Sequence, residues 1–239
     1  MTYVNPTFVY ARGSIYLFGL GEGKTVCARY SFGDKKSYYY EIHDIAGDSY
    51  VSACFDGSRN IYLLGGSIDH KLFNRVDCFD ITTKKTRLVT NLVNIRNYPP
   101  PHTYYHNNLV YIVGAKTNFT MARSLVSFDV VNHVTTVEHI LPEITGRIMS
   151  CFDGQDRIFF KEKETIITYS LANKDAGKYA SKCPVDGHLV YDPATDGILI
   201  LGGMSKNFRH SIKDDIWTQI VDNDKTVDRL KNSGCLVRG

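Results

Sequence analysis

One apolar segment recurs five times along the chain, and this repeat constrains the fold more than any other feature. The copies are IYLFG at Ile15–Gly19, IYLLG at Ile61–Gly65, VYIVG at Val110–Gly114, IFFKE at Ile158–Glu162 and ILILG at Ile198–Gly202. Their last residues are 46, 49, 48 and 40 positions apart. Tandem units of one period indicate a repeat architecture, in which each unit buries its apolar face against its neighbours.

Two further motifs keep the same period. The segment Cys54–Gly57 returns unchanged as Cys151–Gly154, two repeats later. The segment Cys78–Ile81 returns as Ser127–Val130, one repeat later, with its central Phe-Asp pair preserved. Because independent motifs share one spacing, the repeat is a property of the whole chain.

Turn-forming pairs precede the apolar segments and show how the strands connect. They are Arg-Gly at 12–13, Asp-Gly at 56–57, 153–154 and 196–197, and Asn-Asn at 107–108. Such pairs tolerate positive φ, so each predicts a tight hairpin between a first strand and the apolar second strand. A continuous apolar strand is typical of burial on both faces. A third strand around Phe79 or Phe128 and a polar outer strand such as 86–90 complete a four-stranded propeller blade.

The sequence therefore predicts an all-β fold, a β-propeller of about five four-stranded blades in one domain over residues 1–239. The blades are expected at 6–43, 49–91, 101–140, 147–181 and 187–231. A composition of 12% aromatic residues and 19 glycines suits strands and tight turns. Two alternatives remain for the ends of the chain. Residues Met1–Val4 complete the last blade, or Gly234–Val237 begin a sixth blade of an incomplete six-bladed ring.

The repeats resemble the kelch family. The resemblance lies in double glycines after an apolar strand, at Gly65–Gly66 and Gly202–Gly203, and in aromatic-Asp pairs at Phe79–Asp80 and Phe128–Asp129. Asp214–Trp217 also looks like the third-strand signature of that family. The resemblance implies a kelch-type propeller in which the loops after the second and fourth strands open on one face.

Composition argues against several classes of function. The net charge is only +3 and no run of five like charges occurs, so no nucleic-acid footprint is indicated. Apolar runs of about five residues are far too short for a membrane helix. The six cysteines are dispersed without a C-x-x-C pair, and residues 1–6 do not look like a signal peptide. We therefore expect reduced thiols and a cytoplasmic protein.

Catalytic and metal motifs are weak, so we expect no enzyme activity and no cofactor. Gly19–Thr25 is rich in glycine but is followed by a strand-like segment, which favours a loop between strands over a phosphate-binding loop. His102 and His106, with His133 or His139, are the one arrangement that could bind zinc. No G-x-S-x-G motif occurs. The alternative is a propeller enzyme, similar in architecture to galactose oxidase or to sugar-processing propellers, with its site in the central channel.

Basic and aromatic residues gather in the loops expected on one face. The loops after the second strand include 70–74, 116–119 and 206–210, and the connectors after the fourth strand contribute further basic residues. Such residues are enriched in binding hot spots. The predicted partner-binding residues are Lys71, Phe73, Arg96, Tyr98, Lys116, Phe119, Arg123, Arg147, Phe208 and Arg209.

These residues predict a non-enzymatic module that binds a protein or peptide. The basic loops would favour an acidic partner. The kelch resemblance implies partners such as cytoskeletal proteins or clients of a ubiquitin ligase. The alternative left open is that each Phe packs under its own blade and each Lys is only solvated.

Overall fold

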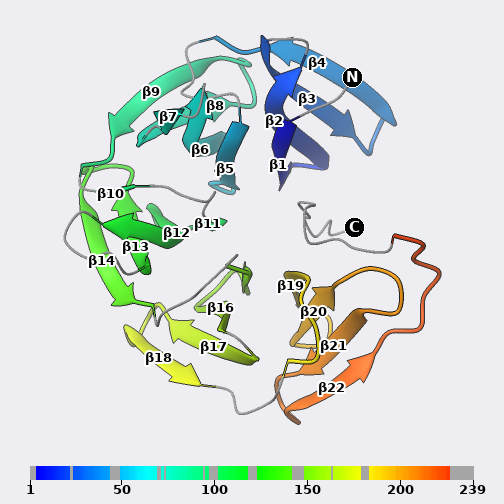
Figure 1. The fold of residues 1–239 in the computed structure, drawn as a ribbon. Helices are drawn as coiled ribbons and strands as arrows, with labels where there is room; N and C mark the ends of the chain where they lie inside the picture. The colour runs from blue at the N-terminus through cyan, green and yellow to red at the C-terminus, as the bar shows by residue number, and fades with distance from the viewer. Residues whose placement is uncertain are drawn as a thin grey trace. The chain divides into compact units, whose positions relative to one another are not determined.

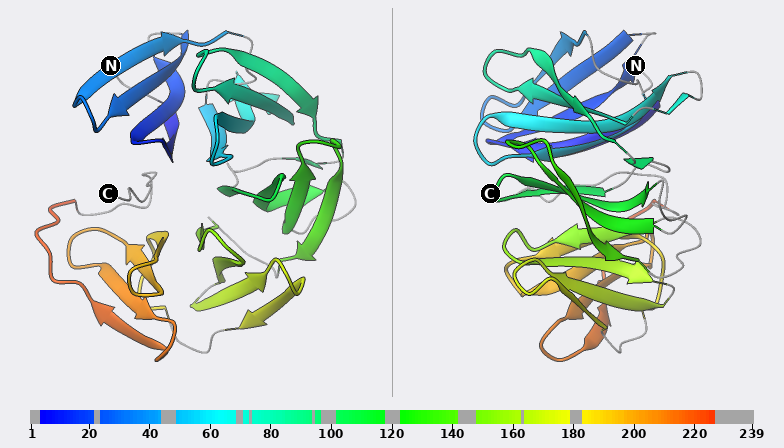
Figure 2. Two further views of the ribbon diagram at one scale, coloured as in Figure 1. Left: turned by 180° about the vertical axis from the view of Figure 1, so that it is seen from behind. Right: turned by 90° about the vertical axis from the view of Figure 1, so that its left-hand side faces the viewer.

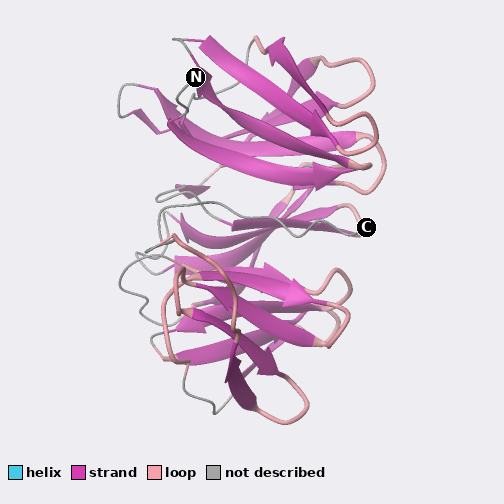
Figure 3. Cartoon of the chain, turned by 90° about the vertical axis from the view of Figure 1, so that its right-hand side faces the viewer, coloured by secondary structure: helices cyan, strands magenta, loops and turns pink. Residues whose placement is uncertain are grey.

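The computed structural model describes most of the chain, and the described part is built from strands. The described residues are 4–21, 24–43, 49–68, 71–72, 74–93, 95–96, 102–117, 123–141, 148–162, 164–178 and 183–226. Figure 3 shows strands and loops but no helix among them, so no helix there could cross a membrane. The chain divides into two compact units, Met1–Leu141 and Pro142–Gly239.

The first unit contains three antiparallel sheets, each a meander of four strands in chain order (Figure 1). The first sheet consists of β1 (Val4–Ala11), β2 (Ser14–Gly21), β3 (Lys24–Ser31) and β4 (Lys36–Glu41). The second consists of β5 (Ser49–Phe55), β6 (Asn60–Ile68), β8 (Arg75–Asp80) and β9 (Thr86–Asn91), with β7 (Lys71–Leu72) beside β6. The third consists of β11 (His102–His106), β12 (Leu109–Thr117), β13 (Arg123–Asp129) and β14 (Thr135–Ile140), with β10 (Ile95–Arg96) beside β12.

The second unit repeats the pattern in two more sheets, which Figure 2 shows from two further sides. One sheet consists of β15 (Ser150–Phe152), β16 (Arg157–Glu162), β17 (Thr165–Ser170) and β18 (Asp175–Lys178). The other consists of β19 (His188–Asp192), β20 (Gly197–Leu201), β21 (Asn207–Ser211) and β22 (Ile216–Gln219). The five predicted four-stranded blades are therefore confirmed. Ring closure was predicted to depend on Met1–Val4 or on Gly234–Val237. Val4 is described and pairs with Leu20 of β2, whereas residues 1–3 and 234–237 lie outside the described residues.

The apolar second strands are buried, as their composition predicts. Ile61–Leu64 of β6, Val110–Val113 of β12 and Ile158–Phe160 of β16 are all nearly inaccessible to solvent. Neighbouring sheets within a unit also pair aromatic rings. Tyr62 of β6 stacks on Tyr105 of β11, with ring centroids 5.9 Å apart, and Phe159 of β16 stacks on Tyr191 of β19 at 6.1 Å. Offset-stacked rings add to the free energy of burial, so these pairs help to hold successive sheets together.

The turns between first and second strands are of two kinds. Arg12–Gly13 and Asn107–Asn108 are two-residue turns with φ values of 45°, 71°, 48° and 63°, so the predicted tight hairpins are confirmed there. The same prediction is wrong for Asp196–Gly197, because residues 193–196 separate the paired residues Asp192 and Gly197. It is also wrong for Asp56–Gly57 and Asp153–Gly154, which begin longer loops. In both, the Asp carboxylate accepts hydrogen bonds from three backbone amides of the loop, which stabilises the longer connection.

Each third strand ends in a common turn that leads into the fourth strand. In the second to fifth sheets a buried aromatic or His residue is followed by Asp or Ser, whose side chain accepts backbone N–H bonds of the turn, as Asp80 does from Thr82 and Thr83. In the first sheet the corresponding pair is the exposed Tyr30 and Ser31. The fourth residue after that Asp or Ser has positive φ in all five sheets. These residues are Lys35 (55°), Lys84 (60°), His133 (57°), Lys174 (58°) and Asp215 (56°).

The last sheet corrects one element of the sequence analysis. Asp214–Trp217 was predicted to mark a third strand, but the third strand is β21, which ends at Ser211. The Ser211 hydroxyl accepts a hydrogen bond from the Asp214 backbone, so Asp214 belongs to the turn and Trp217 to the fourth strand, β22.

Connections in an antiparallel meander alternate between the two ends of the strands. We call the end with the connections between strands one and two, and three and four, the turn edge. In the first unit it comprises residues 12–13, 32–35, 56–59, 81–85, 107–108 and 130–134. The opposite end, where second strands finish and third strands begin, is the linker edge. Of the binding residues predicted in this unit, the described ones belong to the linker edge: Lys71, Arg96, Lys116 and Arg123.

Candidate functional site

Three of the predicted binding residues lie side by side at the linker edge of the third sheet. In the strand register Arg96 of β10 pairs with Lys116 of β12, and Lys116 pairs with Arg123 of β13. We call these three residues the basic row. They are separated by up to 27 positions in the sequence, and the order β10-β12-β13 brings them together.

Arg123 is the residue of the basic row that has a buried, unsatisfied hydrogen-bond donor. It is half-buried, and its Nη1 atom is shielded from solvent without a hydrogen-bond acceptor among the described residues. Burial lowers the pKa of this guanidinium below its usual value. A buried donor on a charged group is costly when unsatisfied, so Arg123 would gain from an external acceptor such as a carboxylate.

The other predicted residues are less informative, and three of them lie in strands. Lys71 lies in β7, where its backbone pairs with Ile68. Phe208 and Arg209 were predicted in a loop but lie within β21. The physical reason is that the preceding connection is short: the Gly202 amide bonds to the Lys206 carbonyl, so the strand begins at Asn207. Phe73, Tyr98, Phe119 and Arg147 lie outside the described residues.

The described residues of the Gly-rich segment 19–25 lie in the paired strands β2 and β3. Gly21 of β2 pairs directly with Lys24 of β3, and β3 continues as a strand to Ser31. A phosphate-binding loop needs a helix N-terminus at this point.

The histidines considered for zinc occupy separate strands of the third sheet. His102 and His106 lie in β11, His139 lies in β14, and His133 lies in the turn before β14, where its ring is 6.2 Å from that of Phe128. The order β11-β12-β13-β14 places two strands between β11 and β14. Within the described ranges, no group of three His, Cys, Asp or Glu residues is placed to hold a metal ion.

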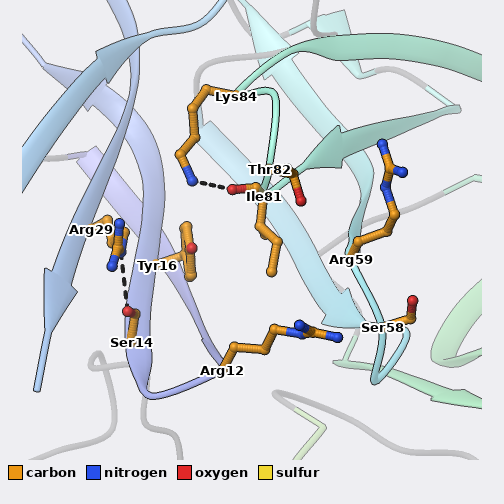
Figure 4. A pocket seen from close by; sticks show the side chains of 9 residues that line it. All are labelled: Arg12, Ser14, Tyr16, Arg29, Ser58, Arg59, Ile81, Thr82 and Lys84. Carbon is orange, nitrogen blue, oxygen red and sulfur yellow. Dashed lines mark hydrogen bonds between the residues drawn. The ribbon is translucent and has the colours of Figure 1, made fainter. Parts of the chain in front are cut away.

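A pocket at the turn edge of the first two sheets was not anticipated from the sequence (Figure 4). It has a volume of about 400 Å³ and is lined by residues from four separate segments of the chain. They are Arg12, Ser14, Tyr16, Arg29, Ser58, Arg59, Ile81, Thr82 and Lys84. We call this the cationic pocket, because its lining contains four basic side chains and no carboxylate.

One of the four cations is neutralised by a neighbour. Arg59 forms an ion pair with Asp80, which is not part of the lining. The hydrogen bond from Arg59, together with those from the Thr82 and Thr83 amides, lowers the pKa of Asp80 to about 2. Asp80 therefore stays ionised and remains paired with the Arg59 guanidinium.

The pocket escaped sequence reasoning because its residues belong to different repeats. Arg12 comes from the first hairpin turn, Arg29 from β3, and Lys84 from the third turn of the second sheet. These residues share no sequence motif, and they lie at the opposite edge from the loops predicted to bind a partner. The one available signal was the basic character of equivalent turn positions, with Lys at 35, 84 and 174.

Comparison with known proteins supports the architecture. No protein-family model matches this sequence, and no curated protein matches it. Solved structures do match, among them one titled "Structure of YjhT", with a TM-score of 0.61 and 14% sequence identity over 85% of this chain and 73% of that chain. The chain has a β-propeller fold. At this level of identity the likeness establishes the fold of the propeller and nothing about its activity.

Proposed function

We propose that this propeller is a non-catalytic binding module that holds an acidic segment of a partner protein at the basic row. The observation that supports it most is the half-buried Arg123, whose Nη1 has no acceptor among the described residues. A guanidinium presents its donors in a planar fork that fits a carboxylate, and such pairs are shorter and stronger than neutral hydrogen bonds.

The neighbours of Arg123 support the same chemistry. Lys116 is opposite Arg123 in the register, and Arg96 is opposite Lys116, so three basic residues occupy adjacent strands at one edge. Like charges on adjacent strands are unfavourable in the absence of a counter-charge. An acidic segment of a partner would supply that counter-charge.

The wider assignment rests on the kelch resemblance and on the cysteines. The resemblance suggests cytoskeletal proteins or clients of a ubiquitin ligase as partners, because propellers of that family commonly bind proteins. A cytoplasmic location is supported by the five described cysteines, all of which are free and buried.

The Arg123→Gln variant tests the proposal, because it should weaken partner binding without lowering the stability of the fold. Partner capture by proximity labelling should fall by about tenfold, as expected for loss of a charged hydrogen bond. The free energy of unfolding in urea should stay the same or rise, since the variant removes an unsatisfied buried charge. Arg87→Gln, at an exposed position of β9, is the control and should change neither.

Three results would count against the proposal. If Arg123→Gln captured the same proteins at undiminished yield, or lost stability in proportion to binding, Arg123 would be a structural residue. Stoichiometric copper or zinc in elemental analysis of the purified chain would favour the alternative of a propeller enzyme.

A further inference from the structure

The cationic pocket contains more positive charge than the described residues neutralise. Arg59 is paired with Asp80, but Arg12, Arg29 and Lys84 make no ion pair with any carboxylate in the described part of the chain. Three cations that line one concavity repel one another, and the repulsion is relieved when an anion enters. The charge of the site therefore points to an anionic ligand.

Two of these cations are held in place by neighbouring groups. The Arg29 Nε donates to the Ser14 Oγ at 3.0 Å, and the guanidinium carbon lies 5.1 Å from the centre of the Tyr38 ring. The Lys84 Nζ donates to the Ile81 carbonyl and lies over the ring of Tyr16 (Figure 4). Because these side chains are already oriented, a ligand would lose less entropy in ordering them.

The environment of Lys84 indicates that the charge is held at a cost. Burial, and then the nearby Arg29, lower the pKa of Lys84 below its usual value. Both effects disfavour the ammonium form while the pocket lacks a counter-ion. An anion beside Nζ would reverse the second effect.

The polar groups of the lining favour a phosphate over a carboxylate. Two guanidinium groups and an ammonium carry three positive charges, which a dianion balances better than a monoanion does, and the hydroxyls of Ser58 and Thr82 add donors. A phosphate monoester offers three acceptor oxygens and up to two negative charges, whereas a carboxylate offers two oxygens and one charge. The volume of about 400 Å³ is within the usual range for small-molecule sites and exceeds the needs of a phosphate alone.

We propose that the cationic pocket, which Arg12, Arg29 and Lys84 line, binds a small phosphate monoester whose organic part fills the space that the phosphate leaves. This site is at the turn edge of the first two sheets, whereas the basic row is at the linker edge of the third. Its ligand and its variants are therefore independent of the proposed protein-binding function.

Calorimetric titration of the full chain at constant ionic strength tests the ligand class. The probes are glucose 6-phosphate, glycerol 3-phosphate and adenosine 5′-monophosphate, each compared with its dephosphorylated counterpart, with inorganic phosphate and with acetate. At least one monoester should bind about tenfold more tightly than inorganic phosphate and than its own dephosphorylated form, while acetate should not bind measurably.

Two substitutions test the place of binding. Arg12→Asn suits the positive φ of the turn, since blade three has Asn-Asn there, and Lys84→Gln keeps the length of the side chain. Each substitution should weaken the binding of the monoester by about tenfold. Lys35→Gln and Lys174→Gln are matched controls, because both lysines occupy the equivalent turn position with the same φ but do not line the pocket. Thermal melting confirms that each variant is folded.

Several outcomes would overturn the proposal. It fails if no monoester binds, if acetate binds as tightly, or if Lys84→Gln and Lys35→Gln have the same effect. If no monoester bound more tightly than inorganic phosphate, the pocket would be a site for phosphate itself, and the proposed organic part of the ligand would be wrong. A phosphoserine peptide that bound more tightly than every small monoester would assign the pocket to a protein partner instead.

Discussion

Gly197 illustrates how a single residue adapts to the close approach of two strands. It begins β20 and is paired across the sheet with Ser211 of β21. A Cβ atom built on Gly197 would lie 2.7 Å from the carbonyl oxygen of His210 and 3.0 Å from the Thr195 hydroxyl. The nearest obstacle is backbone, which cannot move aside without disturbing the strand pairing. Glycine is required here by contact, and its φ is not in the left-handed region.

Gly197→Ala should therefore destabilise the protein by roughly 1–3 kcal/mol, as overpacking against backbone does. Gly177→Ala is the matched control, because Gly177 also lies in a strand, β18, and a Cβ there meets nothing within 4 Å. We expect that variant to change the free energy of unfolding in urea by less than about 0.5 kcal/mol. Equal effects of the two substitutions would show that strand propensity, and not the His210 contact, determines the cost.

At the scale of the element, the loop between β15 and β16 depends on one buried carboxylate. Asp153 Oδ1 accepts hydrogen bonds from the backbone amides of Gln155, Asp156 and Arg157 at 2.8–3.0 Å. Its Oδ2 accepts a further bond from the Arg157 Nε at 2.8 Å, and the side chain is only 5% exposed. Burial alone would raise the pKa of Asp153, but the bonds from Arg157 and the amides outweigh it and lower the pKa below its ordinary value.

A lowered pKa in the folded state means that Asp153 stabilises the fold above its unfolded pKa of about 3.9. That contribution is lost as the pH falls through the folded value. We expect Asp153→Asn to lower the free energy of unfolding at pH 7 by roughly 1–3 kcal/mol, because a charged partner of Arg157 is removed. The difference from the wild type should shrink as the pH falls below about 4.

Urea unfolding at a series of pH values measures this difference. Asp175→Asn, at an exposed position of β18, is the control and should follow the wild type at every pH. A difference for Asp153→Asn that stayed constant down to pH 2 would mean that the carboxylate charge contributes nothing, and that the substitution acts through geometry alone.

Across the whole molecule, burial is graded from the inner strands to the outer ones. The second and third strands of the second and third sheets, β6, β8, β12 and β13, are almost entirely buried where their side chains are described. The fourth strands, such as β4, β9, β14 and β22, alternate between half-buried and exposed residues. Among the described strands, each fourth strand pairs only with the third strand of its own sheet.

Native-state hydrogen exchange should follow this gradient, because local opening is easiest where few apolar contacts are broken. We expect the amides of β12 and β13 to exchange slowest and those of β4 and β22 to exchange at least about tenfold faster. Mass spectrometry of peptic fragments resolves these segments. Protection of β22 equal to that of β12 would contradict the gradient and would indicate that another surface covers the outer strand.

Local sequence patterns predicted the strands well and the last turns less well. Ile61–Leu64 and Val110–Val113 are apolar at every position, and a short run of this kind between turn signals is typical of a strand buried on both faces. Phe208 and Asp214–Trp217 were misassigned by a few residues because a polar segment such as 206–215 carries no hydrophobic pattern. Its strand is defined by hydrogen bonds to β20, which are not local.

The sequence by itself determined the number of sheets, the order of strands within each sheet and the buried face, since these follow from periodic burial of apolar residues and from turn chemistry. Only the tertiary structure decided which charged residues meet. Arg96, Lys116 and Arg123 are neighbours through strand register, and Arg12, Arg29 and Lys84 are neighbours through the packing of two sheets. The physical reason is that burial is a property of each residue in its own strand, whereas a site depends on long-range pairing between strands that no local pattern encodes.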